Sequence, residues 1–152
     1  MRYYFEDVDK QKDLEKILES WIHPHTPYRH HCGVKGMGCD CIYFVARVLE
    51  EMGVLKWRKD IIPDNPRDSH MHNTRELLAE SIEREMRVER VELSGLMNGD
   101  IILYHYGQAC SHAAIFLGES IYHSVDRSGV VKTPFSDLTF RKRAQYAYRI
   151  LR

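Results

Sequence analysis

The segment Gly38-Cys39-Asp40-Cys41-Ile42-Tyr43-Phe44-Val45 marks the point where a glycine-rich loop meets an apolar helix. Cys41 stands at the start of the expected helix, where the free N–H groups of the first turn carry partial positive charge and favour a thiolate. The same groups can stabilise the oxyanion that forms when a thiolate attacks a carbonyl. The position favours a nucleophilic cysteine, although a free cysteine in a helix is more often a small buried residue.

A nucleophilic cysteine requires a base, and two histidines lie on consecutive expected strands. His112 stands at the start of one strand and His123 lies in the next. If a two-residue turn at Gly118-Glu119 joins them, residue 123 faces residue 114, and the two histidines become diagonal neighbours on one face of the sheet. A three-residue turn would place them on opposite faces. The sequence alone leaves both registers open.

The first half of the chain has the apolar spacing of helices. Residues 14–21 predict a first helix that Asp9 can cap, and a second helix starts at Asp40 or Cys41 and stops at Gly53. Asn73 predicts the start of a third helix. Between the second and third helices, proline, asparagine and aspartate predict a long loop over 54–71.

The second half has the alternation of strands, which gives an α+β fold with the helices packed on a sheet of about five to six strands. Short turns between the strands imply antiparallel pairing. The expected strands are 101–106, 113–117, 121–125, 130–133 and 146–151.

Length and charge limit the class of protein. The chain has 152 residues with 22 basic and 22 acidic side chains, so we expect a single domain over residues 1–152 and no electrostatic drive toward nucleic acid or anionic membranes. The N-terminus has no signal-peptide pattern, and no stretch reaches the roughly 18 apolar residues of a membrane span. Cytoplasmic synthesis with four reduced cysteines is therefore expected.

Five segments in this order resemble the NlpC-type peptidases, papain-like hydrolases that cut cell-wall peptides. The nucleophile motif resembles 40–45 (Asp-Cys-Ile-Tyr-Phe-Val), and an upstream tyrosine segment resembles 26–29 (Thr-Pro-Tyr-Arg). The Gly-Asp strand opening resembles 99–103, and the base-histidine strand resembles 111–118. The segment with the third polar residue resembles 122–124 (Tyr-His-Ser). The resemblance covers roughly residues 14 to 135.

This resemblance implies a role for each matching residue. Cys41 is the nucleophile, His112 its base, and His123 holds the base in the productive tautomer. Tyr28 and Asp40 belong to the oxyanion or substrate-binding site. The bond implied by the family is the amide between D-glutamate and the diamino acid of a peptidoglycan stem peptide, cut without a cofactor or metal.

The sequence departs from the family pattern at Ile42 and Tyr43, which replace the common Ser-Gly, so substrate choice is open. The combination of 26–30 with 34–41 most resembles the phage and gene-transfer-agent branch. That branch implies phage tail proteins as partners, and delivery to the cell wall by a tail or at lysis.

Three other interpretations stay open. His30, His31, Cys32, Cys39 and Cys41 offer zinc ligands, but without a paired Cys-x2-Cys knuckle the signal for a metal site is weak. A non-catalytic tail-assembly or binding module could keep the same fold. A thiol acyltransferase or deamidase would use the same three catalytic residues on another substrate.

Overall fold

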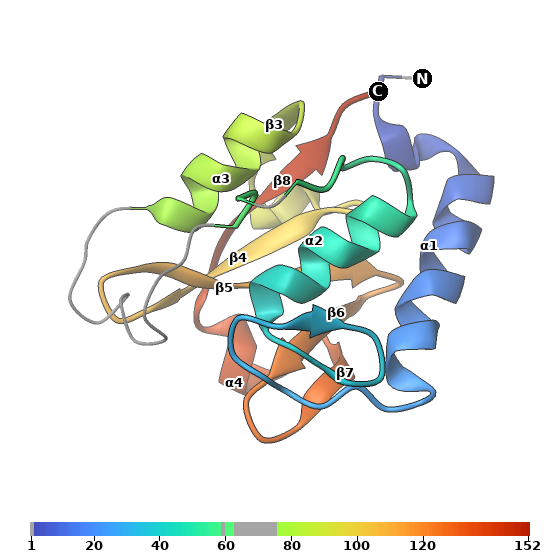
Figure 1. Cartoon of the computed structure of the whole chain (residues 1–152). Helices are drawn as coiled ribbons and strands as arrows, with labels where there is room; N and C mark the ends of the chain where they lie inside the picture. The colour runs from blue at the N-terminus through green and yellow to red at the C-terminus, as the bar shows by residue number, and fades with distance from the viewer. Residues whose placement is uncertain (1, 59, 63–75) are drawn as a thin grey trace.

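The computed structural model describes residues 2–58, 60–62 and 76–152 (Figure 1). Its helical elements are η1 (Tyr4–Glu6), α1 (Val8–Ile22), α2 (Cys41–Glu51), α3 (Leu77–Glu85), η3 (Leu93–Gly95) and α4 (Leu138–Arg141). Its strands are β1 (Gly33–Val34), β2 (Gly38–Cys39), β3 (Val88–Val91), β4 (Ile101–Tyr106), β5 (Ala109–Leu117), β6 (Ser120–Val125), β7 (Gly129–Pro134) and β8 (Ala144–Ile150).

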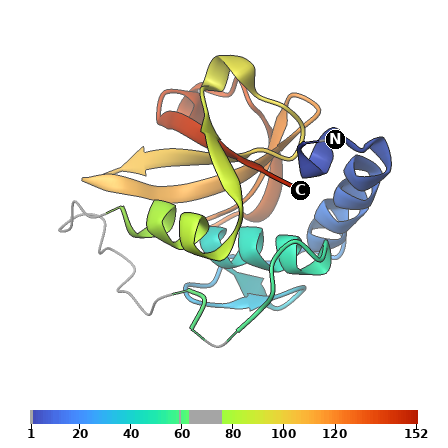
Figure 2. The ribbon, with the colours of Figure 1, turned by 90° about the horizontal axis from the view of Figure 1, so that it is seen from above.

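One antiparallel sheet organises the described part of the chain, with six strands in the order β3-β8-β4-β5-β6-β7. Helices α1, α2 and α3 lie on the same side of this sheet (Figures 1 and 2). The two ends of the chain meet, because the Arg152 N–H donates to the Arg2 carbonyl at 3.0 Å. No helix within the described residues is long and apolar enough to cross a membrane.

The expected α+β class and the antiparallel sheet are confirmed, with differences in detail: β5 begins at Ala109, and the short strands β1 and β2 and the helix α4 were not expected. The cap of α1 is Asp7 and not Asp9, since the Asp7 side chain accepts the free backbone N–H of Asp9 at 2.9 Å. Strand β3 was not expected, because its sequence Val-Glu-Arg-Val is short and gains a partner only through β8. Asn73, the expected cap of the third helix, lies outside the described residues.

Helix α2 begins at Cys41, as its sequence predicts. The Asp40 backbone is extended, and its side chain accepts the N–H of Tyr43 at 2.8 Å, so one orphan donor of the first turn is satisfied. Beyond the helix Gly53 takes a φ of +78°, a conformation that costs glycine little. The inner face of α2 is buried against β5 and β6, and its buried residues are Cys41, Phe44, Val45, Ala46, Val48 and Leu49.

The hairpin between β5 and β6 has the two-residue turn. Leu117 pairs with Ser120, and both turn residues have positive φ, 58° at Gly118 and 64° at Glu119. Such a turn matches the right-handed twist of the flanking strands. The structure therefore confirms the register that puts His112 and His123 on one face of the sheet.

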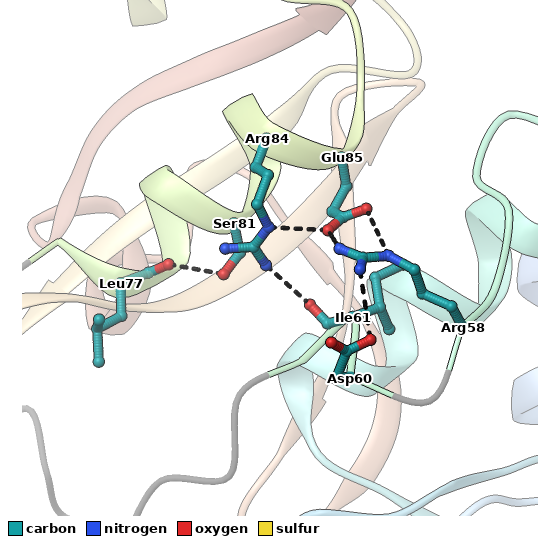
Figure 3. Close-up of polar contacts among 7 residues, drawn as sticks. All are labelled: Arg58, Asp60, Ile61, Leu77, Ser81, Arg84 and Glu85. Carbon is teal, nitrogen blue, oxygen red and sulfur yellow. Dashed lines mark hydrogen bonds and ion pairs between the residues drawn. The ribbon is translucent and has the colours of Figure 1, made fainter.

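The first part of the expected 54–71 loop is tied to α3. Arg58 pairs with Glu85, which also accepts from Arg84, and Arg84 reaches the Ile61 carbonyl at 3.3 Å (Figure 3). An apolar cavity lies between α2, α3 and this segment, with Ile42, Ile61 and Leu78 among its lining residues. Residues 63–71 of the expected loop lie outside the described residues.

A buried ion pair joins the start of β4 to β8. The Asp100 side chain is 1% exposed and accepts from Arg149 Nε at 3.0 Å, from Arg149 Nη2 at 2.8 Å and from the Met97 N–H at 2.8 Å. Every one of these bonds is charge-assisted, and such bonds are roughly twice as strong as neutral ones. Asp100 therefore fixes the turn that leads into the central strands.

Replacing Asp100 should test this anchor. Asp100→Asn leaves the Arg149 guanidinium buried without its counter-charge, and we expect a loss of about 3 kcal/mol in the free energy of unfolding, measured by urea denaturation. The control is Arg2→Gln, which removes a surface pair with Glu89 whose arginine side chain is 70% exposed. That change should cost below about 1 kcal/mol. Equal losses in the two variants would show that the buried pair contributes no more to stability than a surface pair.

Candidate active site

The N-terminus of α2 is held against β6 by backbone contacts. The Ser124 hydroxyl donates to the Cys39 carbonyl at 2.7 Å, two residues before Cys41. The second Asp40 carboxylate oxygen accepts the His31 N–H at 2.7 Å, so this one side chain fixes both the helix start and the preceding loop. The position of Cys41 is therefore set from two sides.

The Cys41 thiol lies against the backbone on either side of His112. Its Sγ donates to the Ser111 carbonyl at 3.6 Å, and the Ala113 N–H is close enough to Sγ to lower the pKa of the thiol. Within the described residues, no hydrogen bond joins Sγ to the His112 ring. The side chain is buried, with 8% of Cys41 exposed.

The thiol fills a gap that the sheet leaves open. Pairing of β5 with β6 extends only from Leu117↔Ser120 to Ile115↔Tyr122. Phe116 directs its N–H and carbonyl to the β4 side, so by strand alternation Ser111 and Ala113 direct theirs toward β6. Cys41 therefore takes the place of a strand partner at these two residues.

The two predicted histidines are in direct contact. His112 Nε2 lies 2.9 Å from His123 Nδ1, and His123 is fully buried whereas His112 is partly exposed. His123 Nε2 in turn lies 3.0 Å from the Thr133 Oγ1 on β7. The result is a chain of polar contacts that runs from His112 through His123 to Thr133.

Aromatic rings enclose this pair on the face of the sheet away from α2. Phe140 of α4 is stacked on His112 with ring centroids 6.0 Å apart, and it meets His123 edge-on at 4.6 Å. Tyr104 and Tyr106 make T-shaped contacts with His112, with ring centroids 5.4 and 5.9 Å apart. These rings bury His123 completely, leave His112 partly exposed and restrict the orientation of both imidazoles.

Burial keeps the three predicted catalytic groups uncharged. It raises the pKa of the Cys41 thiol to about 12, and the Asp40 carboxylate adds to this rise. It lowers the pKa of His112 to about 3, with the charge of His123 as the second cause, and it lowers the pKa of His123 to about 4. At neutral pH the resting site therefore contains a thiol and two neutral imidazoles.

Tyr28 and Asp40 were predicted for the oxyanion or substrate-binding site. Tyr28 lies beside Cys39 in a short parallel bridge, in which the Cys39 N–H donates to the Pro27 carbonyl at 3.0 Å and the Arg29 N–H donates to the Cys39 carbonyl at 3.1 Å. Both Asp40 oxygens accept backbone N–H groups, which gives this residue a structural role. Contact of either residue with substrate stays a prediction.

Tyr43, which replaces a common glycine, packs on the preceding loop. Its hydroxyl lies 3.3 Å from His31 Nε2, and a Cβ added at Gly33 would come within 2.6 Å of the Tyr43 ring. The absence of a side chain at Gly33 therefore makes room for the tyrosine. Narrowing of the cleft by Tyr43 stays a prediction.

The His- and Cys-rich loop does not gather into one cluster. Cys39 is fully buried in the core, Cys32 is half-buried, and His30 and His31 are exposed. Among the residues that the structure describes, no group of three or more His, Cys, Asp and Glu side chains is placed to hold a metal ion.

Four residues around the histidines were missed from the sequence: Tyr104, Tyr106, Thr133 and Phe140. Thr133 shares a sheet face with His123, since β7 pairs Val131 with His123 and Thr133 lies two residues further along. This signal appears only once the β6–β7 register is known. Phe140 belongs to a four-residue helix that has no strong pattern of its own.

Comparison with models of known protein families identifies one family that matches this chain. The family described as NlpC/P60 matches residues 25–149, which include all the predicted site residues. A comparison with curated proteins found no match.

Solved structures of that family share the fold. An NLP/P60 family protein of Staphylococcus aureus, described as similar to lipoprotein, matches with a TM-score of 0.67 at 18% identity over 96% of this chain and 43% of its own. An NlpC/P60 family protein of Bacillus cereus matches with a TM-score of 0.64 at 20% identity over 93% and 40%. The NlpC/p60 domain of the peptidoglycan hydrolase SagA matches with a TM-score of 0.57 at 18% identity over 90% and 96%.

These matches confirm the papain-like NlpC-type fold that the sequence predicts. This chain spans less than half the length of the first two structures and nearly all of the SagA domain.

The buried histidines predict how stability depends on pH. An unfolded histidine binds its proton near pH 6.5, whereas folded His123 and His112 bind theirs near pH 4 and 3, so the unfolded state takes up more protons between pH 6.5 and 4. The contribution of these two histidines to stability should be constant above about pH 7 and fall as the pH decreases through this interval. Each histidine should account for on the order of 2 kcal/mol between pH 7 and 5.

Urea unfolding at pH 7, 6 and 5 measures this loss. His123→Gln should reduce the loss in the free energy of unfolding between pH 7 and 5 by the contribution of one histidine, because glutamine does not titrate. His25→Gln, which replaces an exposed histidine, is the control and should keep the wild-type slope. A His123→Gln protein with the wild-type slope would show that His123 does not carry this dependence.

Proposed function

Because this chain belongs to the NlpC/P60 family, we propose that it is a cysteine hydrolase of bacterial peptidoglycan. A structural neighbour that matches nearly the whole chain is described as a domain of a peptidoglycan hydrolase. The proposed bond is the amide between D-glutamate and the diamino acid of the stem peptide. The proposed catalytic residues are Cys41, His112 and His123.

One observation carries the catalytic assignment. His112 and His123 are 2.9 Å apart, and the Cys41 thiol lies against the peptide groups that flank His112. A nucleophile, a base and a group that orients the base are the three parts of a catalytic triad. The three side chains come from α2, β5 and β6, which is the arrangement expected from the resemblance.

The contacts of the two rings support Nδ1 of His112 as the base nitrogen. His112 Nε2 is occupied by His123, which leaves Nδ1 to take the thiol proton. In the resting site the thiol proton is directed at the Ser111 carbonyl, so the S–H bond first rotates toward His112. The sulfur then attacks the substrate carbonyl carbon as its proton moves to Nδ1.

In the remaining steps the proton on His112 Nδ1 passes to the leaving amine, and a water molecule hydrolyses the thioester. The C–N bond of the tetrahedral intermediate breaks, and Nδ1 gives its proton to the leaving amine. Water then attacks the thioester carbon as Nδ1 takes its proton. The C–S bond breaks to release the acid, and Nδ1 returns the proton to the sulfur, which restores the thiol and the neutral imidazole. The oxyanion of each intermediate is stabilised by the Cys41 backbone N–H, in the first turn of α2, and by the Tyr28 hydroxyl.

Digestion of purified muropeptides, read by mass spectrometry, tests this proposal. The wild-type protein should release the stem peptide after D-glutamate. Cys41→Ala should lower the rate at least a thousandfold, because removing a nucleophile leaves only binding and oxyanion stabilisation. Cys32→Ala removes a half-buried thiol of the preceding loop and should retain the wild-type rate.

Two outcomes would count against the proposal. Cleavage by Cys41→Ala at the wild-type rate would contradict the role of Cys41. Absence of cleavage by a folded wild-type protein would contradict the peptidoglycan substrate.

A further inference from the structure

We propose that Thr133 is a positioning residue whose hydroxyl oxygen accepts from His123 Nε2 and so supports the tautomers of both active-site histidines that leave His112 Nδ1 free to act as the base. This inference rests on the proposed function for its catalytic consequence. Its structural part, the tautomer of each ring, can be tested without any substrate. The starting point is the chain of contacts His112 Nε2 to His123 Nδ1 at 2.9 Å and His123 Nε2 to Thr133 Oγ1 at 3.0 Å.

The position of one proton determines the others along this chain. A base at His112 Nδ1 requires the proton of the neutral ring to be on Nε2, which then donates to His123 Nδ1. His123 Nδ1 must accept, so the proton of the second ring is on Nε2. That N–H then points at Thr133 Oγ1, and the hydroxyl oxygen must accept it.

The opposite arrangement would leave His112 without a basic nitrogen for the thiol. If His123 carried its proton on Nδ1, it would donate to His112 Nε2, and the His112 proton would move to Nδ1. An Nδ1–H cannot take a proton from Cys41. The two arrangements have the same heavy-atom positions. A hydroxyl can accept in the first and donate in the second, but only the first needs an acceptor at His123 Nε2.

Burial makes that acceptor necessary. His123 has no exposed surface, and within the described residues the Thr133 hydroxyl is the only hydrogen-bond partner of its Nε2. Without an acceptor, an N–H at this position would be a buried donor with no hydrogen bond, which is costly. The ring would then favour the tautomer with its proton on Nδ1, which is the inactive arrangement.

The matched variants are Thr133→Val, which keeps the shape and removes the hydroxyl, and Thr133→Ser, which keeps the hydroxyl. Thr133→Val should lower kcat on muropeptides by roughly tenfold to a hundredfold with little change in KM, because Thr133 does not contact the thiol or the base. Thr133→Ser should retain most of the wild-type kcat. Thr139→Val, at an exposed position in α4, is the control and should leave kcat unchanged.

The tautomers themselves are read from imidazole ¹⁵N chemical shifts of histidine-labelled protein at pH 7. In wild type, His112 and His123 should both be protonated on Nε2, and in Thr133→Val both should shift toward protonation on Nδ1. Unchanged tautomers in a folded Thr133→Val protein, or an unchanged kcat, would overturn the inference. Failure of the wild type to cut muropeptides would instead count against the proposed function, while the ¹⁵N shifts would still decide the role of Thr133.

Discussion

The pairing of β5 with β6 is the constraint on which the rest of the site depends. The two-residue turn at Gly118-Glu119 fixes the register, and the register brings His112 and His123 to one face of the sheet. The same ladder stops after Ile115↔Tyr122, which leaves backbone groups of β5 without a strand partner. Buried backbone groups need hydrogen bonds, and the start of α2 supplies one through the Cys41 thiol. The short ladder and the position of the proposed nucleophile are therefore two parts of one arrangement.

Burial and the helix start act on the thiol in opposite directions. The N–H groups of Cys41 and Ile42 favour a thiolate, as the position at a helix start predicts, but the loss of water around the sulfur outweighs them. The same burial disfavours the charged imidazole of His112, so the proton donor and the proton acceptor are both uncharged in the resting site. A dry site also strengthens each hydrogen bond to an oxyanion. The chemistry that fits this environment couples the proton transfer to attack on the substrate.

The loop that precedes the proposed nucleophile packs around Asp40 and Tyr43. Asp40 accepts N–H groups from Tyr43 and His31, so a single buried carboxylate joins the loop to the helix. Tyr43 then packs on Gly33, where a side chain would collide with its ring. These contacts place the bulky tyrosine on the loop.

The sequence by itself determined the α+β class, the helix start at Cys41, the central strands and the three residues proposed for catalysis. Those features depend on apolar spacing, turn chemistry and capping, which act between near neighbours in the chain. Only the tertiary structure decided which turn joins β5 to β6, that Asp7 caps α1, that β3 joins the sheet, and that Thr133 and Phe140 reach the histidines. It also decided that the thiol is neutral. Strand register, cross-strand hydrogen bonds and the exclusion of water depend on residues far apart in the chain, and local sequence patterns do not contain that information.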